Sequence, residues 1–311
     1  MAVHENHRMM RKTVQTNLSG WGVLLLVVCW LCQCVAQAAG PDTNSAALLR
    51  SRYTELEQQL SHNQFKRPLY LDSVESPSYL RGDIYALVDY PFAAVSQALH
   101  DPTHWCDVLI LHINTKYCHA MTTQADTILV VRIGKKDYQP VDQAQRVEFE
   151  YRVATTTPEY FDIGLSAKTG PMGTSDYRIR LEALSLQGDK TFLHITYSYA
   201  YNLVGGIAMQ AYLATIARDK VGFTLTAKQS GSASDYIGGV RGVVERNTMR
   251  YYLAIDAYLG SLSAAPAQQL EERLQSWFTA TELYPRQLRE LDRATYLDMK
   301  RREYLRQQTP P

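Results

Sequence analysis

The sequence predicts an α+β protein in which an antiparallel sheet with one buried face packs against helices. Three observations carry this prediction. The stretch TFLHITYSYAYN at Thr191–Asn202 alternates strictly and places Leu193, Ile195 and three tyrosines on one face. The same period of two recurs upstream, and a long apolar helical pattern follows Gly242. Alternation with one apolar and one charged face is typical of an antiparallel sheet that is wet on one side.

The first 39 residues have the pattern of an export signal. Three basic residues precede the apolar run GVLLLVVCWLC, and Ala36-Gln37-Ala38 follows it. Basic, apolar and small-residue regions in this order predict a signal peptide and a periplasmic or secreted protein. The alternative is an uncleaved N-terminal anchor, because the apolar run is close to the length that spans a membrane.

The charge of the chain argues against a general nucleic-acid binder. Removal of residues 1–38 takes three basic residues and one acidic residue from totals of 32 and 31, which leaves the chain near neutral. Nucleic-acid binders usually carry a clear basic excess.

Two cysteines, Cys106 and Cys118, remain after the predicted signal peptide. In an oxidising compartment two such cysteines favour an internal disulfide, and HINTK between them offers a turn. The alternative is two buried free thiols. The spacing does not fit a metal site, since no CxxC pair and no third ligand is evident.

The N-terminal part predicts a helix over Ala46–Leu60, two extended segments on either side of Pro77, and a short helix from Pro91 to Leu99. The apolar stretch Trp105–Ile113 fits a helix or a strand equally well.

After Cys118, alternating segments predict successive strands around Leu129–Ile133, Val147–Val153 and Tyr177–Ala183. A longer loop is expected at Thr169–Ser175, and a tight turn at Gln187–Lys190.

The C-terminal part predicts a helix at Ile207–Ala217, a strand at Val221–Ala227 and a long helix from Gly242 to Leu262. Two charged helical pieces, divided at Pro285, are expected over Gln268–Gln307. The basic stretch Arg286–Arg306 could meet an anionic membrane surface or a partner protein, or form a solvated face.

The stretch ALVDYPFAAVSQALHDPTHW leads from a strand through Tyr90, Pro91 and Phe92 to Trp105. With the strands and the long helix that follow, it resembles the START-like (helix-grip, SRPBCC) superfamily. The resemblance implies a curved sheet wrapped around the C-terminal helix, enclosing a cavity for lipid-like molecules. It places a lead-in at residues 40–76, the domain at 77–263 and an added helical extension at 264–311.

The ligand site is predicted where aromatic residues share the buried face with the long helix. Tyrosines there would offer an apolar wall with hydroxyls that orient a ligand, or they are simply large core residues. The predicted ligand-binding residues are Phe149, Tyr151, Tyr177, Tyr197, Tyr199, Tyr201, Met249, Tyr252 and Leu253.

No catalytic motif of the nucleophile-elbow, zinc-protease or P-loop type is present, and no cofactor or metal is predicted. Glu245 and Asp256 on the long helix are interpreted as surface carboxylates, and His194 as exposed. The segment Gly238–Gly242, with Arg241 and Arg246 beside it, is a minor anion-site hypothesis.

The leading hypothesis is therefore an exported protein that binds or transfers an apolar, lipid-like molecule. The enzymatic alternative is a cyclase or hydrolase that uses Glu245, Asp256, His112 or His194. The third alternative is an interaction protein without a ligand, which predicts an exposed apolar patch around Trp277 and Phe278.

Overall fold

The computed structural model describes residues 41–202, 206, 219–226 and 235–309. The predicted signal peptide or anchor and the predicted helix at Ile207–Ala217 lie outside the described residues, as does most of the Gly- and Ser-rich segment that follows Ala227. None of the described helices is long and apolar enough to cross a membrane.

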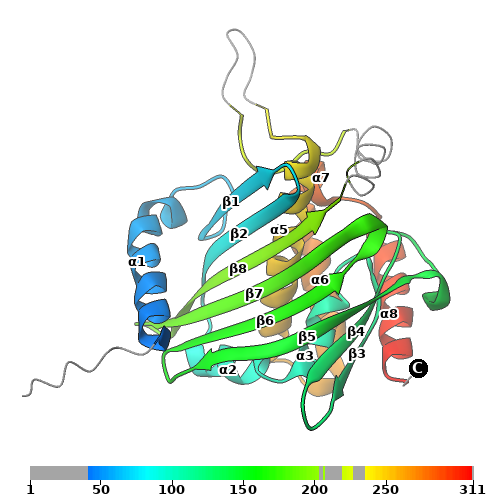
Figure 1. Ribbon diagram of the computed structural model, residues 1–311, viewed down its shortest axis with the longest axis horizontal. Coiled ribbons are helices and arrows are strands. Elements are labelled where there is room, and N and C mark those ends of the chain that lie inside the picture. The colour runs from blue at the N-terminus through cyan, green and yellow to red at the C-terminus, as the bar shows by residue number, and fades with distance from the viewer. Residues whose placement is uncertain (1–40, 203–205, 207–218, 227–234, 310–311) are drawn as a thin grey trace, which may run out of the picture. The chain divides into compact units, whose positions relative to one another are not determined.

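Eight antiparallel strands form one open, curved sheet (Figure 1). Their spatial order is β1-β2-β8-β7-β6-β5-β4-β3, so the hairpin formed by the first two strands pairs with the last strand. The strands are β1 Leu69–Ser76, β2 Tyr79–Val88, β3 Thr115–Thr122, β4 Thr127–Ile133, β5 Gln145–Thr156, β6 Tyr160–Thr169, β7 Thr174–Leu186 and β8 Lys190–Tyr201.

The long helix α5, Gly239–Ser261, packs on the inner face of the sheet and lies behind it in Figure 1. Its closest approach is at Gly82 of β2, where an added Cβ would lie 2.3 Å from Thr248 Oγ1. Only glycine leaves room for the helix at this position. This sheet against a long C-terminal helix is the helix-grip arrangement, and the predicted fold class is confirmed.

Two short helices, α2 Phe92–Leu99 and α3 Pro102–Leu109, follow β2. Asp101 caps α3 by accepting from the Thr103 N–H, and the Trp105 indole N–H donates to the Leu99 carbonyl at 2.9 Å. The ambiguous stretch Trp105–Ile113 is therefore helical through Leu109. A disulfide joins Cys106 of α3 to Cys118 of β3, as predicted.

The C-terminal extension forms α6 Pro266–Glu282, the single turn α7 Pro285–Leu288 and α8 Arg293–Gln307, which confirms the break at Pro285. Trp277 stacks on Tyr296 with ring centroids 4.8 Å apart, and Phe278 is also buried. The patch that the interaction-protein hypothesis required at Trp277 and Phe278 is thus part of the core, because α8 covers it.

The basic residues of this extension pair with nearby acids on the surface. The pairs include Arg286–Asp235, Arg289–Glu282 and Arg301–Glu271. Membrane contact through this stretch stays a prediction.

The predicted N-terminal helix is α1, Pro41–Ser61, and it covers part of the outer face of the sheet. Leu49, Leu56 and Leu60 form a second apolar cluster with sheet residues such as Phe192. The Tyr53 ring meets the Phe192 ring at 5.1 Å. One end of the outer face is therefore dry.

Two secondary-structure predictions need correction. Strand β6 was not predicted, although Phe161, Ile163 and Leu165 alternate with polar residues. The segment expected as a strand at Val221–Ala227 makes only a single bridge, Leu225 to Tyr236, within its described part. The Glu245 carboxylate accepts the N–H groups of Phe223 and Thr224, so these groups are not available to a neighbouring strand.

Candidate functional site

The tyrosine stripe of β8 faces the long helix, as the alternation predicts. The Tyr197 ring lies 5.1 Å from the ring of Tyr251 on α5, and the Tyr199 ring stacks on Tyr177 of β7 at the same distance. Phe192 faces α1 on the opposite side. Four aromatic rings from two strands and one helix therefore meet inside the grip, and we call them the tyrosine cluster.

The hydroxyls of this cluster lie in a low-dielectric interior. Thr174 Oγ1 donates to the Tyr177 hydroxyl at 3.0 Å, and the Tyr197 hydroxyl donates to the same oxygen. Burial raises the pKa of Tyr197, Tyr199 and Tyr251. The phenols stay protonated and can act as hydrogen-bond donors or acceptors.

The other predicted residues are spread over several environments. Phe149 and Met249 are buried in the main core. The Tyr151 hydroxyl donates to the His100 carbonyl at 2.8 Å, and the Tyr201 hydroxyl donates to the Ser76 carbonyl at 3.2 Å, so both hydroxyls are held by the backbone.

Tyr252 and Leu253 turn away from the tyrosine cluster. Tyr252 lies beside Arg67, and Leu253 lines a cleft of about 380 Å³ between α5 and α6. Arg67 pairs with Asp256 at 2.6 Å at the edge of this cleft. Asp256 is thus a paired acid and not a freely solvated carboxylate.

His112 adjoins the tyrosine cluster, and sequence analysis gave it only a minor role. It lies in the turn between α3 and β3, is buried, and stacks on Tyr251 at 4.8 Å. The Asn114 backbone N–H lies 3.2 Å from Nδ1. A backbone N–H can only donate, so Nδ1 is the acceptor and Nε2 carries the proton of the neutral ring.

The Nε2 atom of His112 is buried and has no hydrogen-bond partner in the described part of the chain. The Asn247 side chain lies beside the imidazole without reaching hydrogen-bond geometry at this atom. Burial, and then the charge of Arg250, hold the pKa of His112 well below its usual range. The ring is therefore a neutral donor at physiological pH.

Arg250 is the second residue with an unmet donor near this end of the cluster. Its Nη atoms bind Asn247 and Glu290 at 3.2 and 2.8 Å, but its buried Nε has no partner among the described residues. Lys136 and Lys220 also lie near Glu290, at 2.6 and 4.0 Å. Three cationic side chains thus surround this one carboxylate.

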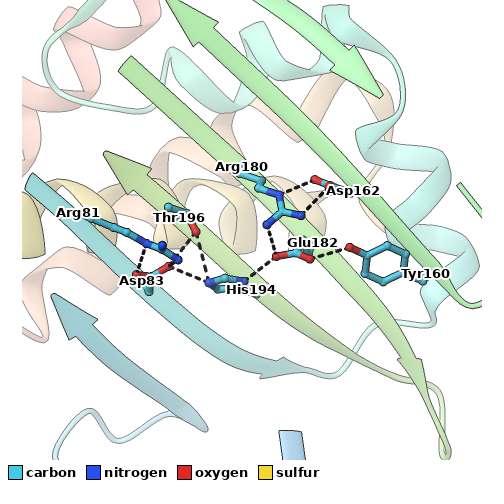
Figure 2. Close-up of polar contacts among 8 residues, drawn as sticks. All are labelled: Arg81, Asp83, Tyr160, Asp162, Arg180, Glu182, His194 and Thr196. Atoms are coloured by element: carbon cyan, nitrogen blue, oxygen red, sulfur yellow. Dashed lines mark hydrogen bonds and ion pairs between the residues drawn. The ribbon is translucent and has the colours of Figure 1, made fainter. Parts of the chain in front are cut away.

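The outer face of the same strands carries a polar network that sequence analysis missed (Figure 2). His194, expected to be exposed, is 6% exposed and lies between two acids. Its Nε2 is 2.8 Å from Asp83 Oδ1, and its Nδ1 is 2.8 Å from Glu182 Oε2. The prediction was wrong because the neighbouring strands β2 and β7 supply these carboxylates.

Each carboxylate of the network has further partners. Arg81 and Thr196 donate to Asp83, and the Tyr160 hydroxyl donates to Glu182 at 2.6 Å. Arg180 binds Asp162 through two hydrogen bonds and pairs with Glu182 at 2.9 Å. The charges form an alternating row across four strands.

Burial is the largest effect on the three central groups and disfavours their charged forms, but the hydrogen bonds outweigh it. The pKa of His194 is raised by its bonds to Asp83 and Glu182. The pKa values of Asp83 and Glu182 are lowered, mainly by the bond to His194. His194 is thus an imidazolium with both nitrogens engaged and cannot accept a proton.

Glu245, interpreted from the sequence as a surface carboxylate, is fully buried. It accepts hydrogen bonds from Ser73, from Thr224 Oγ1 and from two backbone N–H groups. The carboxylate holds the segment after β8 onto α5, which a pattern of helix spacing cannot reveal.

The residues of the minor anion-site hypothesis are engaged within the protein. Arg241 donates to Ser73 Oγ at 2.7 Å, and Arg246 donates to the Val221 carbonyl. Within the described ranges, no group of three His, Cys, Asp or Glu residues is arranged to hold a metal ion.

A second, open cleft of about 870 Å³ lies along the charged part of β4 to β7. Its walls alternate in sign and include Arg146, Glu148, Lys168 and Asp176. Tyr177 reaches its edge as well as the tyrosine cluster.

No family model matches the chain, and no curated protein matches it. Several solved structures are similar to it. Human StAR-related lipid transfer protein 5 is 9% identical with a TM-score of 0.30, over 56% of this chain and 92% of that one. The ZhuI aromatase/cyclase from Streptomyces sp. R1128 is 14% identical with a TM-score of 0.31, over 48% and 86%. Norcoclaurine synthase from Thalictrum flavum is 9% identical with a TM-score of 0.29, over 48% and 82%.

Proposed function

We propose that this helix-grip chain binds an apolar, lipid-like molecule that carries one polar group, held between β7, β8 and α5. The observation that supports the proposal is the composition of that interior. Four tyrosines meet there beside His112, whose Nε2–H is buried without an acceptor. A core that only had to be stable would use aliphatic side chains, because buried polar atoms without partners cost free energy.

The chemistry of such a site divides between two parts. The apolar body of a ligand would gain about 25 cal/mol for each Å² removed from water, before the costs of binding. The tyrosine hydroxyls, held neutral by burial, would orient the polar group. Affinity then follows ligand size, and orientation follows the hydroxyls.

Native mass spectrometry of the purified protein, with organic extraction of any bound molecule, tests the proposal. We expect a co-purifying apolar compound that is released on denaturation. Tyr199→Phe should change its occupancy, whereas Tyr85→Phe, on the outer face, should not. A wild-type protein that carries no such compound and binds no apolar probe would exclude the proposal.

We also propose that the chain is exported. The predicted signal peptide supports this, and so does the Cys106–Cys118 disulfide, since disulfides persist in oxidising compartments. Cell fractionation with mass measurement of the mature N-terminus tests it. A reduced, full-length protein in the cytoplasm would contradict it.

The enzymatic alternative narrows to His112. Glu245, Asp256 and His194 are occupied by their partners, whereas His112 has a free Nε2–H and could donate a proton to a bound molecule. Extraction of the ligand before and after prolonged incubation separates the two functions. A binding protein returns the same compound, and an enzyme returns a changed one that is lost with His112→Phe.

A further inference from the structure

The unmet groups at one end of the tyrosine cluster share a single chemical character. His112 Nε2 is a proton donor, since Nδ1 already accepts from the Asn114 N–H. Arg250 Nε is also a donor, because a guanidinium has no acceptor. Both atoms are buried and without partners in the part of the chain that the structure describes. An oxygen with lone pairs is what each of them lacks.

The two donors are neighbours through Asn247. The Arg250 Nη1 donates to Asn247 Oδ1 at 3.2 Å, and the same side chain lies beside the His112 ring. All three residues adjoin Tyr251, which packs on Tyr197. The donors therefore lie at the end of the proposed ligand site and not in a separate part of the core.

The charges around this end favour a negative guest. Arg250, Lys136 and Lys220 surround the single carboxylate of Glu290. Lys300 lies close to the same ring, since its Nζ donates to the His112 carbonyl at 2.8 Å. In an interior of low dielectric constant, an anion placed here would interact strongly with these cations.

We propose that the ligand is an organic anion, with an acidic head, such as a carboxylate, at His112 and Arg250 and an apolar body along the tyrosine cluster. This inference rests on the proposed function and sharpens it from any apolar molecule to an amphipathic acid. A carboxylate accepts from both donors, while an alcohol offers a neutral oxygen and leaves the cations without a counterion.

Titration calorimetry with decanoate and decan-1-ol, which share a ten-carbon chain, tests the proposal on the full-length purified protein. We expect decanoate to bind at least about tenfold more tightly, because hydrogen bonds to a charged group exceed those to a neutral one. His112→Phe should remove most of that preference and leave decanol binding unchanged. His112→Gln, which keeps a side-chain N–H, should retain part of it.

The outcomes are separable. Equal affinities for the two probes in the wild-type protein, or an unchanged preference in His112→Phe, would overturn the inference and leave the proposed function standing. Binding of neither probe would remove both. The comparison of probes on the wild-type protein does not depend on whether a variant folds, and melting temperatures identify variants that are damaged.

Discussion

The two faces of strand β8 treat polar groups in opposite ways. On the outer face, none of the eight residues in Figure 2 has a buried side-chain polar atom without a partner. On the inner face, the tyrosine cluster ends at His112 and Arg250, each with a buried N–H that has no acceptor. A complete network holds strands together, whereas an incomplete one has a vacancy that a ligand can satisfy. The contrast distinguishes a structural site from a candidate binding site more clearly than residue type does, since each face has a histidine.

The largest expected effect is on the outer face. His194→Leu would leave the Asp83 and Glu182 carboxylates buried without their central cation, which should lower the free energy of unfolding by about 3–5 kcal/mol. Urea denaturation followed by circular dichroism measures it. The matched control is His62→Leu, because His62 is exposed and should change stability by less than about 0.5 kcal/mol. A loss below about 1 kcal/mol for His194→Leu would show that the network is not a structural unit.

A smaller effect is expected at the end of the same network. Tyr160→Phe removes the hydroxyl that donates to Glu182 at 2.6 Å, in a cluster that α1 covers. Hydrogen bonds to charged groups are worth about 1.5–3 kcal/mol, so we expect a loss in that range by urea denaturation. The ring and its packing are retained, so the variant isolates the hydroxyl. An unchanged stability would mean that Arg180 and His194 alone satisfy the carboxylate.

The sequence could predict the inner face because alternation alone fixes which side chains of β8 point together. It could not predict the outer network, because that depends on strand pairing. Asp83 is 111 residues from His194 and Glu182 is 12 away, and only the pairing of β2, β8 and β7 brings them together. An exposed histidine was the reasonable expectation for a face otherwise rich in charge.

The inner face was itself only partly predictable. Val244, Thr248 and Tyr251 follow the helical spacing of one face, so Tyr251 could have been chosen in place of Tyr252. His112 had no such signal, because it lies in a turn with no period. Its role depends on a backbone hydrogen bond from Asn114 and on the stacking of Tyr251, which appear only in three dimensions.

The pH dependence of stability should also come from the outer face. The folded pKa of His194 is raised, so its contribution is complete below the unfolded value of about 6.5 and is lost as pH rises through the folded value. The folded pKa values of Asp83 and Glu182 are lowered, so their contribution is complete above the unfolded values of about 4 and is lost as pH falls through the folded ones.

We therefore expect maximal stability between about pH 4 and 6.5, with about 1.4 kcal/mol lost at alkaline pH for each pKa unit by which His194 is raised. Urea titrations from pH 3 to 10 measure this curve. In His194→Leu the alkaline decline should be absent. A decline of the same size in that variant would assign it to other groups.

The smallest effect on stability is expected on the inner face, and it completes the comparison. Tyr197→Phe removes a hydrogen bond between two neutral phenols, and Tyr177 still accepts from Thr174, so the loss should be about 1 kcal/mol or less. The ring contact with Tyr251 remains. Binding of the decanoate probe should nevertheless weaken severalfold, because the hydroxyl lies along the proposed ligand body. Tyr160→Phe should show the reverse, with a larger loss of stability and unchanged binding. If the two variants behaved alike in both measurements, the division between a structural outer face and a ligand-binding inner face would be wrong.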